Sequence, residues 1–589
     1  MKSNWYAASL LLGAAHALNM SELEALYTEG TTPDTANIGG LETTDHECDK
    51  AIDESTTGFW LSAQTNTSQS ITIQLSDQQK IVSGLTTVPR HNRSTSMIEQ
   101  HEVALSLNGE NWDIVAYGTW WPDTSQKVSS FQPKKAKFLR LSGPAPNGIS
   151  IADIRLYETE FIEPNPAGGA WGTTIDFPLV PVAGAVDPVS GNFVVCSAWG
   201  YNIFTGGKGG KTQTAIWDPK ANTVTRRRIN ETHHDMFCPG ISLDTNGKVE
   251  VTGGADAGLY HFVRMFVIGG SWSESVGGKN GEVYDTETNV WTKLDGANVS
   301  AMLTDDERTY RQDNHGWLFS WTGGSVFQAG PSKEMNGYGT SDTGTTAPAG
   351  TRTGDEDAMC GNAIMYDKGK ILAFGGSKYY ETTEATKYAA IISIDQPDEA
   401  ANVVALPFDE SQPQLIPEMF VLDSTNNQGG EWIEQTKNSV IRVYHSLSLL
   451  LQDGTVLTGG GGLCGSCDSN HFDGQIYTPS YLLNADGSDC VRPVIQSVSP
   501  NAVKPGDSVE ITTDGPVNIQ ASIIRYGSAT HTVNTDQRRI SVQLSSTGTN
   551  DYSFDIPSEP GIALPGYYML FVLNNDGTPR HSVNIQVTV

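Results

Sequence analysis

The sequence predicts an all-β protein with more than one domain, on three observations. Glycine is abundant, with 61 residues, there are 28 prolines, and charged residues make up only 18% of the chain. This composition suits short strands and turns better than long helices. Apolar runs that end in Gly-Gly recur through the middle of the chain, and no long block shows helical periodicity. At 589 residues the chain is too long for a single hydrophobic core, so we expect two to four domains.

The N-terminus carries the pattern of a secretory signal. A lysine precedes an apolar run from Trp5 to Ala15, and Ala15-His16-Ala17 forms a small-residue cleavage site. This run is too short to span a bilayer, and no later apolar stretch is long enough. We therefore expect residues 1–17 to be a signal peptide and the mature protein to be secreted and extracellular.

The net charge argues against some classes of partner. The chain has 37 basic and 67 acidic residues, a formal net charge of −30. Such a surface repels phosphate backbones and anionic lipids. We expect a monomer with no nucleic-acid partner and no membrane partner.

Residues 18–160 are expected to form the first domain. Short alternating strands such as ITIQLSDQQKIVSGLTTVPR and VALSLNGENWDIVAYGTW are separated by turn dipeptides, which indicates a β-sandwich. The order of these pieces resembles the F5/8 type C, or discoidin, family, which implies a carbohydrate-binding domain with a glycan as its partner. Trp60 and Trp120 could stack on sugar rings, or they could pack inside the sandwich, which is the commoner position.

Residues 168–490 follow a Pro/Gly-rich linker and repeat one theme. Apolar strands end in Gly-Gly in VEVTGG, RMFVIGG, KILAFGG and GTVLTGGGG, and partner strands such as GEVYDTETNVW carry Tyr or Trp. Several copies at blade-like spacing resemble the kelch-type β-propellers. Residues 491–589 then show the strand pattern of a small Ig-like β-sandwich that caps the propeller.

Four stretches carry the most specific chemical pattern: HDMFCPGIS around Cys238, GGSW at Trp272, VIRVYHS at Tyr444 and His445, and ATHTVNTDQRR around His531. Together with RQDNHGWLFSW and DAMCGNAIMYD, they resemble the galactose and glyoxal oxidases, the copper-radical oxidases, in order and context. On the residues alone the pattern is open. A Tyr-His pair on a strand usually places one side chain in the core and one in solvent, and a lone histidine is more often a hydrogen-bonding loop residue than a ligand.

The resemblance implies a role for each of these residues. His445 and His531 would be equatorial ligands of one copper ion, and Tyr444 would be the axial phenolate that takes the proton of the substrate hydroxyl. Cys238 would form a thioether with a tyrosine that stores a radical, and Trp272 would stack over that thioether. Two imidazoles with phenolate oxygens suit tetragonal Cu(II), whereas zinc favours tetrahedral Cys/His clusters. The implied reaction oxidises a primary alcohol to an aldehyde and reduces O2 to hydrogen peroxide.

The cysteine count fits such a modification. Seven cysteines are an odd number for an exported chain, so at least one is free, paired between chains or otherwise modified. A thioether at Cys238 would account for the odd one, although Cys238 could also be a small buried residue beside Pro239. Cys464 and Cys467 would form a structural disulfide next to the copper, by the same resemblance. The partners of the remaining cysteines stay open: Cys48, Cys196, Cys360 and Cys490.

The chain departs from the family at the radical tyrosine. VTGGADAGLYHFVRMFVIGGSW runs almost directly from one Gly-Gly strand to the next, so the strand that carries this tyrosine is absent. Tyr260 is the only tyrosine in this stretch, and it lies too near Trp272 to match the family spacing. A second gap falls near ALPFDESQPQ, so two of the seven blades are expected to be incomplete. Coding segments missing from the chain or a decayed paralogue would both explain these gaps.

Substrate-binding residues are implied by the same resemblance. Arg311 matches an arginine that hydrogen-bonds sugar hydroxyls, and Phe204 and Phe408 match aromatic wall positions. Tyr380 and Glu381 fall where the galactose oxidases have Tyr-Gln, and the carboxylate removes a donor and adds a charge. The substrate could therefore be galactose, an aryl alcohol or another primary alcohol.

Two other functions compete with the oxidase. A sugar-binding protein on an inert propeller would fit the missing tyrosine, but it has no need for the Cys238, Tyr444, His445 and His531 set. A glycoside hydrolase would need two carboxylates at a defined separation, and no pair of acidic residues stands out in the sequence.

Overall fold

The computed structural model describes most of the chain from residue 48 onward. The described residues are 16–17, 24–26, 48–62, 67–75, 78–90, 96–205, 210–231, 233, 235–253, 264–269, 279–285, 288, 290–304, 315–352, 356–380, 383–384, 386, 389–395, 401–405, 415–423, 429–467, 469–534 and 536–589. They form strands and short 3-10 helices and contain no α-helix. None of the described helices has the length and apolar character needed to cross a bilayer. The all-β class is confirmed.

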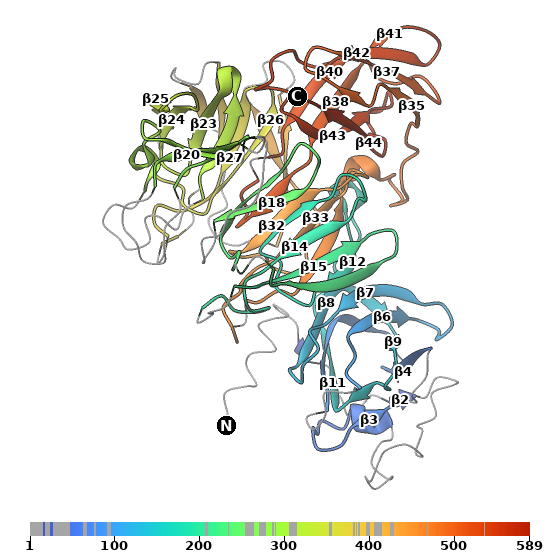
Figure 1. Cartoon of the computed structure of the whole chain (residues 1–589). Coiled ribbons are helices and arrows are strands. Elements are labelled where there is room, and N and C mark those ends of the chain that lie inside the picture. Colours follow the sequence, from blue (N-terminus) through green and yellow to red (C-terminus); the bar gives the residue numbers. More distant parts are fainter. Residues whose placement is uncertain are drawn as a thin grey trace.

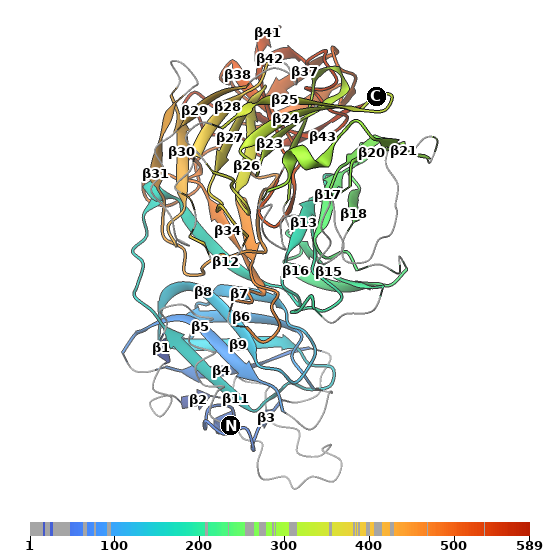
Figure 2. The same ribbon diagram turned by 90° about the vertical axis from the view of Figure 1, so that its left-hand side faces the viewer.

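Three β-rich parts follow one another along the chain and in space. In Figure 2 the N-terminal sandwich lies at one end of the molecule, the central sheets follow, and the C-terminal sandwich lies at the other end. Figure 1 shows the same order from a second side, with β38 and β43 of the C-terminal part packed beside the central sheets.

The N-terminal part is a β-sandwich of two main sheets, ordered β1-β11-β5-β8 and β2-β4-β9-β6-β7, with a small pair β10-β3. Its apolar residues face inward, and Trp60 and Trp120 are 1% and 3% exposed. The interpretation of these two tryptophans as sugar-stacking platforms is therefore wrong, because both belong to the core. The elements are β1 (His16–Ala17), β2 (Glu24–Leu26), η2 (Cys48–Ala51), β3 (Trp60–Leu61), β4 (Ser68–Gln74), β5 (Lys80–Val88), β6 (Gln100–Ser106), β7 (Asp113–Thr119), β8 (Lys127–Ala136), β9 (Phe138–Pro144), β10 (Ser150–Ile151) and β11 (Asp153–Glu158).

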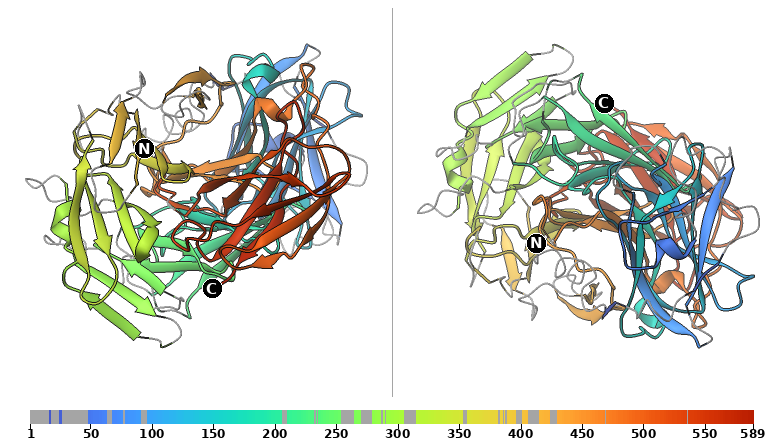
Figure 3. Two further views of the ribbon diagram at one scale, coloured as in Figure 1. Left: turned by 90° about the horizontal axis from the view of Figure 1, so that it is seen from above. Right: turned by 90° about the horizontal axis from the view of Figure 1, so that it is seen from below.

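The central part is a series of small antiparallel sheets, each built from strands that follow one another in the chain. Figure 3 shows the sheets of β19 to β29 on one side and those of β12 to β18 and β32 to β34 on the other. The elements are η3 (Pro166–Gly168), β12 (Ala170–Asp176), β13 (Ala183–Val186), β14 (Phe193–Cys196), β15 (Thr212–Asp218), β16 (Thr223–Ile229), β17 (Pro239–Leu243), β18 (Val249–Gly253), β19 (Arg264–Val267), β20 (Gly281–Asp285), β21 (Val290–Leu294), η4 (Val299–Met302), β22 (Trp317–Trp321), η5 (Thr322–Gly324), β23 (Ser325–Gly330), β24 (Glu334–Gly339), β25 (Thr345–Thr351), β26 (Asn362–Asp367), β27 (Lys370–Phe374), β28 (Ala389–Ser393), β29 (Asn402–Ala405), β30 (Glu418–Leu422), β31 (Gly430–Glu434), β32 (Ser446–Leu450), β33 (Val456–Gly460), β34 (Asp473–Thr478) and η6 (Ser480–Leu482).

In the first blade, β13-β14-β15-β16, burial falls from the inner strand to the outer one. All four residues of β13 are buried, and they are small or β-branched, whereas β16 exposes most of its residues, including Arg226 and Arg227. The same order of strands, inner to outer, is found in β22-β23-β24-β25 and β26-β27-β28-β29. This gradient is what a blade of a propeller needs, because its inner strand meets other blades and its outer strand meets water.

Two sheets of the central part have only two described strands. They are β17-β18 and β30-β31, and the sheet between β18 and β22 has three strands, β19-β20-β21. They flank the two gaps expected from the sequence, near residues 254–263 and 406–414, which lie outside the described residues.

The two ends of the central part meet in one sheet. β12, its first strand, pairs with β34, so that the last blade reads β12-β34-β33-β32. β12 also pairs in parallel with β7, through Thr174 opposite Ala116 and Asp176 opposite Gly118. One continuous sheet therefore runs from the N-terminal sandwich into the last blade.

The C-terminal part is a sandwich of the sheets β35-β37-β42-β41 and β36-β44-β43-β38-β40. Its core is continuous with that of β22 to β28, since Trp317 and Phe319 share one buried cluster with Ile523 and Leu570. The elements are β35 (Ile495–Ser499), β36 (Ala502–Val503), β37 (Ser508–Thr513), β38 (Gln520–Arg525), β39 (Ser528–Thr530), β40 (Arg539–Gln543), β41 (Ser545–Ser546), β42 (Asp551–Asp555), β43 (Gly566–Val572) and β44 (Val583–Val587). The short β39 leaves the sandwich and pairs with β13 of the first central blade.

Candidate metal centre

Three side chains from distant parts of the chain meet at one point. Cys238 directly precedes β17, His445 directly precedes β32, and His531 directly follows β39 of the C-terminal part. Their candidate ligand atoms all lie within 4.8 Å of one another. The Sγ of Cys238 is 3.3 Å from Nε2 of His531, and the two imidazole centroids are 4.6 Å apart.

The backbone at all three residues is in the left-handed region. The φ angles are 54° at Cys238, 70° at His445 and 52° at His531. A residue with a Cβ adopts this region at a cost of about 1–2 kcal/mol, and such residues cluster at functional sites. In each case the turn at the strand end aims the side chain toward the common point.

A backbone carbonyl orients His445. Its Nδ1 lies within hydrogen-bond distance of the carbonyl oxygen of Gly462. With Nδ1–H donating to that carbonyl, Nε2 keeps its lone pair for a metal. Gly462 has φ 94°, and a Cβ there would lie 2.3 Å from the carbonyl oxygen of Ser469. The run of glycines after β33 is therefore needed for the chain to pass this close.

His531 is held by a hydroxyl and by a second ring. Its Nδ1 is 2.6 Å from Oγ1 of Thr530, which leaves Nε2 facing Cys238. The ring of His315 stacks on the His531 ring, with 4.2 Å between centroids and 27° between planes. His531 is 1% exposed and His315 is partly buried, so the orientation of the His531 ring is set by packing as well as by hydrogen bonding.

The environment keeps all three histidines neutral. Burial lowers the pKa of His445 and of His315 to about 4. Burial, with the neighbouring imidazoles, lowers the pKa of His531 well below its ordinary value. Neutral imidazole is the form that binds a metal.

Tyr444 completes the group of donors. Its ring centroid is 4.1 Å from that of His445, and its hydroxyl oxygen accepts a hydrogen bond from the hydroxyl of Tyr380 at 3.0 Å. Burial, then the nearby Cys360, Tyr380 and Cys238, raises the pKa of Tyr444 well above its ordinary value. The phenol is therefore protonated unless a cation is bound beside it.

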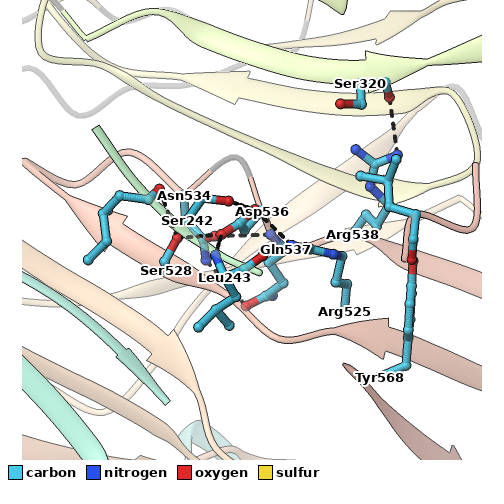
Figure 4. Close-up of polar contacts among 12 residues, drawn as sticks. Ser242, Leu243, Ser320, Arg525, Ser528, Asn534, Asp536, Gln537, Arg538 and Tyr568 are labelled. Carbon is cyan, nitrogen blue, oxygen red and sulfur yellow. Dashed lines mark hydrogen bonds and ion pairs between the residues drawn. The ribbon is translucent and has the colours of Figure 1, made fainter. Parts of the chain in front are cut away.

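Asp536 ties the loop that bears His531 to the strand that follows Cys238. Its carboxylate accepts hydrogen bonds from Ser242 Oγ at 2.8 Å and from the Leu243 amide at 2.9 Å, both on β17. It also accepts from Ser528 Oγ at 2.6 Å and pairs with Arg525 at 2.7 Å, both in the C-terminal part. Figure 4 shows these groups converging on the carboxylate. Asp536 therefore helps to hold the segments that carry two of the donors together, along with the hydrogen bonds of Ser528 and Arg525 to carbonyls of β17.

The wall of the site includes a disulfide and two phenylalanines. Cys464 and Cys467 are joined, with Cα atoms 5.5 Å apart. Phe204 stacks on Phe237 at 4.5 Å between centroids, and its ring lies 6.1 Å from that of His445. Phe204 is 38% exposed, whereas Phe237 is 7% exposed.

The structure brings together Cys238, Tyr444, His445, His531, Tyr380 and Phe204, with the Cys464–Cys467 bridge beside them. The other predicted site residues lie outside the described residues: Trp272, Arg311, Glu381 and Phe408. Tyr260, the one tyrosine in the shortened stretch, lies outside them as well.

Three neighbours of the centre were not predicted from the sequence. His315 stacks on His531, Phe237 packs edge-on against His445 with centroids 5.4 Å apart, and Cys360 lies close enough to act on the pKa of Tyr444. The signal was present, because His315, Cys360 and Phe237 stand in the stretches RQDNHGW, DAMCGNAIMYD and HDMFCPGIS. Motif position alone could not say which of their residues face the centre.

Comparison with known proteins identifies the family. The chain is 42% identical to a galactose oxidase of Gibberella zeae, in an alignment that covers 92% of this chain and 90% of the relative. The chain belongs to the galactose oxidase family. Residues 492–587 match the model of the galactose oxidase-like early set domain, and residues 35–155 match that of the F5/8 type C domain. The oxidoreductase class expected from the sequence is confirmed at the level of the family.

A solved structure extends the comparison to the fold. A fungal alcohol oxidase in complex with copper superposes with a TM-score of 0.66 and 38% identity, over 72% of this chain and all of the other. The copper cofactor expected from the sequence is thus found in a solved member of the family. An aldehyde oxidase of Arabidopsis thaliana matches at 24% identity over 27% of this chain and 28% of its own length.

The alignment with the galactose oxidase also bears on the missing strands. It runs over 621 positions, which exceeds the 589 residues of the whole chain. The relative therefore has residues for which this chain has no counterpart. These additional residues of the relative agree with the two gaps expected from the sequence, which lie beside the two-stranded sheets β17-β18 and β30-β31.

Proposed function

We propose that this chain is a copper-dependent alcohol oxidase that converts a primary alcohol to an aldehyde and reduces O2 to hydrogen peroxide. One observation carries the proposal: Cys238, His445 and His531, which lie far apart in sequence, present their ligand atoms within 4.8 Å of one another. A purely structural role would not require three buried or strained donors at one point. The copper of the solved relative supports the choice of metal.

The donors present fit copper. His445 and His531 each have one ring nitrogen bound to the protein and the other directed to the centre. With the Tyr444 phenol they form a nitrogen and oxygen set that suits Cu(II), and the thiolate of Cys238 is a soft ligand that copper also accepts. We assign His445, His531 and Tyr444 as metal ligands on this basis.

The residues of this chain have distinct parts in the reaction. Bound copper and a tyrosine-centred radical would supply the two one-electron acceptors that alcohol oxidation needs. We assign the Tyr444 oxygen as the acceptor of the substrate hydroxyl proton. The Tyr380 hydroxyl donates a hydrogen bond to that oxygen, which supports this assignment. Phe204 and Phe237 shield one side from water. The tyrosine that would pair with Cys238 is not identified, and Trp272 is assigned to shield it.

The substrate and the other domains follow from the family. The alcohol is galactose at its C6 hydroxyl, an aryl alcohol or another primary alcohol, bound by Arg311, Tyr380, Glu381, Phe204 and Phe408. We assign residues 18–160 as a glycan-binding domain, 168–490 as the propeller and 491–589 as the cap. Residues 1–17 are assigned as the signal peptide of a secreted monomer.

The test is peroxide release by the chain as written, loaded with copper, against galactose and benzyl alcohol. Peroxide above that of a His531→Ala control is expected if the chain is active. Copper retention after dialysis is measured on both proteins, because loss of one ligand is expected to weaken binding by tenfold or more. Retention of copper to the same extent by His531→Ala would overturn the assignment of the site.

A second candidate function is sugar binding on an inert propeller. The two-stranded sheets β17-β18 and β30-β31 favour it, because they lie where strands of the active family are missing. Copper-bound, folded protein that releases no peroxide would support this candidate. Sequencing of the transcript would then show whether coding segments are missing.

A further inference from the structure

The N-terminal sandwich contacts the Trp199–Phe204 loop of the first central blade through an aromatic pair and a carboxylate. Trp121 stacks on Tyr201, with 4.5 Å between centroids and 9° between planes. The hydroxyl of Tyr201 donates to Oδ2 of Asp123 at 2.8 Å. The guanidinium group of Arg226 lies over the Trp121 ring, 5.3 Å from its centroid. The contact therefore joins two domains by a stack and a hydrogen bond on the same side chain.

The carboxylate in this contact is itself fixed. Lys127 Nζ pairs with Oδ1 of Asp123 at 2.5 Å, and the Lys127 side chain is only 4% exposed. A buried ammonium needs its partner, since an unpaired buried charge costs several kcal/mol. Asp123 is thus held in place, and it presents its second oxygen to Tyr201.

The loop that Tyr201 anchors leads directly to the metal centre. The carbonyl of Asn202 accepts from the Gly465 amide at 2.8 Å, and Ile203 forms a β-bridge to Cys464. Phe204 follows, and its carbonyl accepts from the indole N–H of Trp199 at 3.0 Å. Only Asn202 and Ile203 therefore separate Tyr201, which makes the domain contact, from Phe204, whose ring is edge-on to that of His445.

We propose that Trp121 and Asp123 are positioning residues for the metal centre: by holding Tyr201 they fix the Trp199–Phe204 loop and the Phe204 ring. The N-terminal sandwich would then set the affinity for the alcohol as well as bind a glycan. The part of this inference that concerns alcohol affinity rests on the proposed function. The part that concerns the loop rests on the contacts alone.

The first test needs no activity. Hydrogen exchange is measured on the full chain and on Trp121→Ala, at the amides of Gly465 and Val180, which bond to the carbonyls of Asn202 and Tyr201. Exchange about tenfold faster is expected, because loss of the stack lets the loop open locally. Tyr201→Phe keeps the ring and removes only the hydroxyl, so it is expected to fold and to show a smaller increase in the same direction.

Trp112→Ala is the matched control. Trp112 is also a half-buried tryptophan of the sandwich under an arginine, since Arg140 lies 4.3 Å from its centroid. Unchanged exchange at Gly465 and Val180 is expected for this variant. Equal exchange in Trp112→Ala and Trp121→Ala, or no change in Trp121→Ala and Tyr201→Phe, would overturn the inference.

The second test concerns the alcohol. In active, copper-loaded protein, Tyr201→Phe is expected to raise KM for the alcohol about threefold to tenfold, with kcat within twofold and copper content unchanged, as for loss of a positioning contact. Faster exchange without a change in KM would overturn the link to affinity. Absence of peroxide from the unmodified chain as well would count against the proposed function, while the exchange data would still decide the positioning role.

Discussion

His445 and His531 combine a strained backbone with an Nδ1 that is held by a neighbouring oxygen atom. Both have positive φ angles, and both are buried, at 5% and 1% exposure. A left-handed residue is kept only when surrounding contacts hold it there. For His531 two such contacts are the Thr530 hydroxyl and the stacked His315 ring, so the geometry of the centre depends on residues that do not themselves bind the metal.

Thr530→Val removes the hydroxyl that holds Nδ1 of His531 at 2.6 Å, with almost no change in volume. We expect the Cu(II) affinity to fall about tenfold, which is the lower end of the effect of losing such an outer contact. Competition with a chelator followed by absorbance measures it. Thr588→Val serves as the control. It removes a hydroxyl that donates to the Val503 carbonyl within the C-terminal part. Equal affinity in the two variants would contradict the role of Thr530.

The end of β33 decides how closely the chain can pass His445. Gly462→Ala would bring a Cβ to 2.3 Å from the Ser469 carbonyl oxygen at φ 94°. Gly577→Ala has a similar φ of 88° with nothing within 4 Å of the added Cβ. We expect Gly577→Ala to lose about 1 kcal/mol from strain alone and Gly462→Ala to lose about 2–4 kcal/mol, with weaker copper binding. Denaturant titration of both variants checks this, and equal losses would show that the close approach does not matter.

We expect the stability of the protein to depend on pH through Glu250 of strand β18. Burial, then the nearby Asp244, raises the pKa of Glu250 from its ordinary value of 4.5 to about 7. The folded state therefore resists ionisation, so this carboxyl costs stability as pH rises from 4.5 through 7. Glu250→Gln removes that cost. We therefore expect the stability of the variant relative to the unmodified chain to increase by on the order of 1 kcal/mol from pH 5 to pH 8, after allowance for solvent screening.

Thermal unfolding at the two pH values measures this gain. The same substitution at Glu510, an exposed residue of β37, is the control and is expected to show no pH-dependent gain. A constant difference between Glu250→Gln and the unmodified chain across this range would contradict the raised pKa.

On the scale of the whole molecule, a buried pair links the sandwich to the central part. His101 Nε2 lies 2.8 Å from Oδ2 of Asp176, and their side chains are 0% and 1% exposed. Ser129 also donates to this carboxylate, and Trp120 stacks on the His101 ring at 3.6 Å. Together with the parallel pairing of β7 and β12, these contacts lead us to expect that the two parts unfold cooperatively.

Asp176→Ala is expected to lower the free energy of unfolding by about 3–5 kcal/mol, because it leaves buried His101 and Ser129 without their acceptor. Calorimetry should then show the sandwich unfolding in a separate, earlier transition. The control is Asp113→Ala, which loses a surface pair with Lys134 whose side chains are 47% and 74% exposed, and it is expected to cost less than about 1 kcal/mol. A single transition at the original midpoint in Asp176→Ala would contradict the coupling.

The sequence by itself predicted the all-β class and the three-part order, and its resemblance to the galactose and glyoxal oxidases pointed to most of the donor set. Strand periodicity and Gly-Gly strand ends are local properties of the chain. The four donor residues stand in short sequence motifs: Tyr444, His445, Cys238 and His531. The gap that removes the radical tyrosine was also visible there, because it is an absence of residues. These features need no knowledge of which segments touch.

The tertiary structure decided what depends on contacts between distant segments. Only packing shows that His315 stacks on His531, that Trp60 and Trp120 belong to the core, and that Tyr201 stacks on Trp121 of the sandwich. The physical reason is common to all three. A side chain's partners are set by the blade or domain that folds against it, and several of these partners lie hundreds of residues away in the chain, where local sequence carries no signal about them.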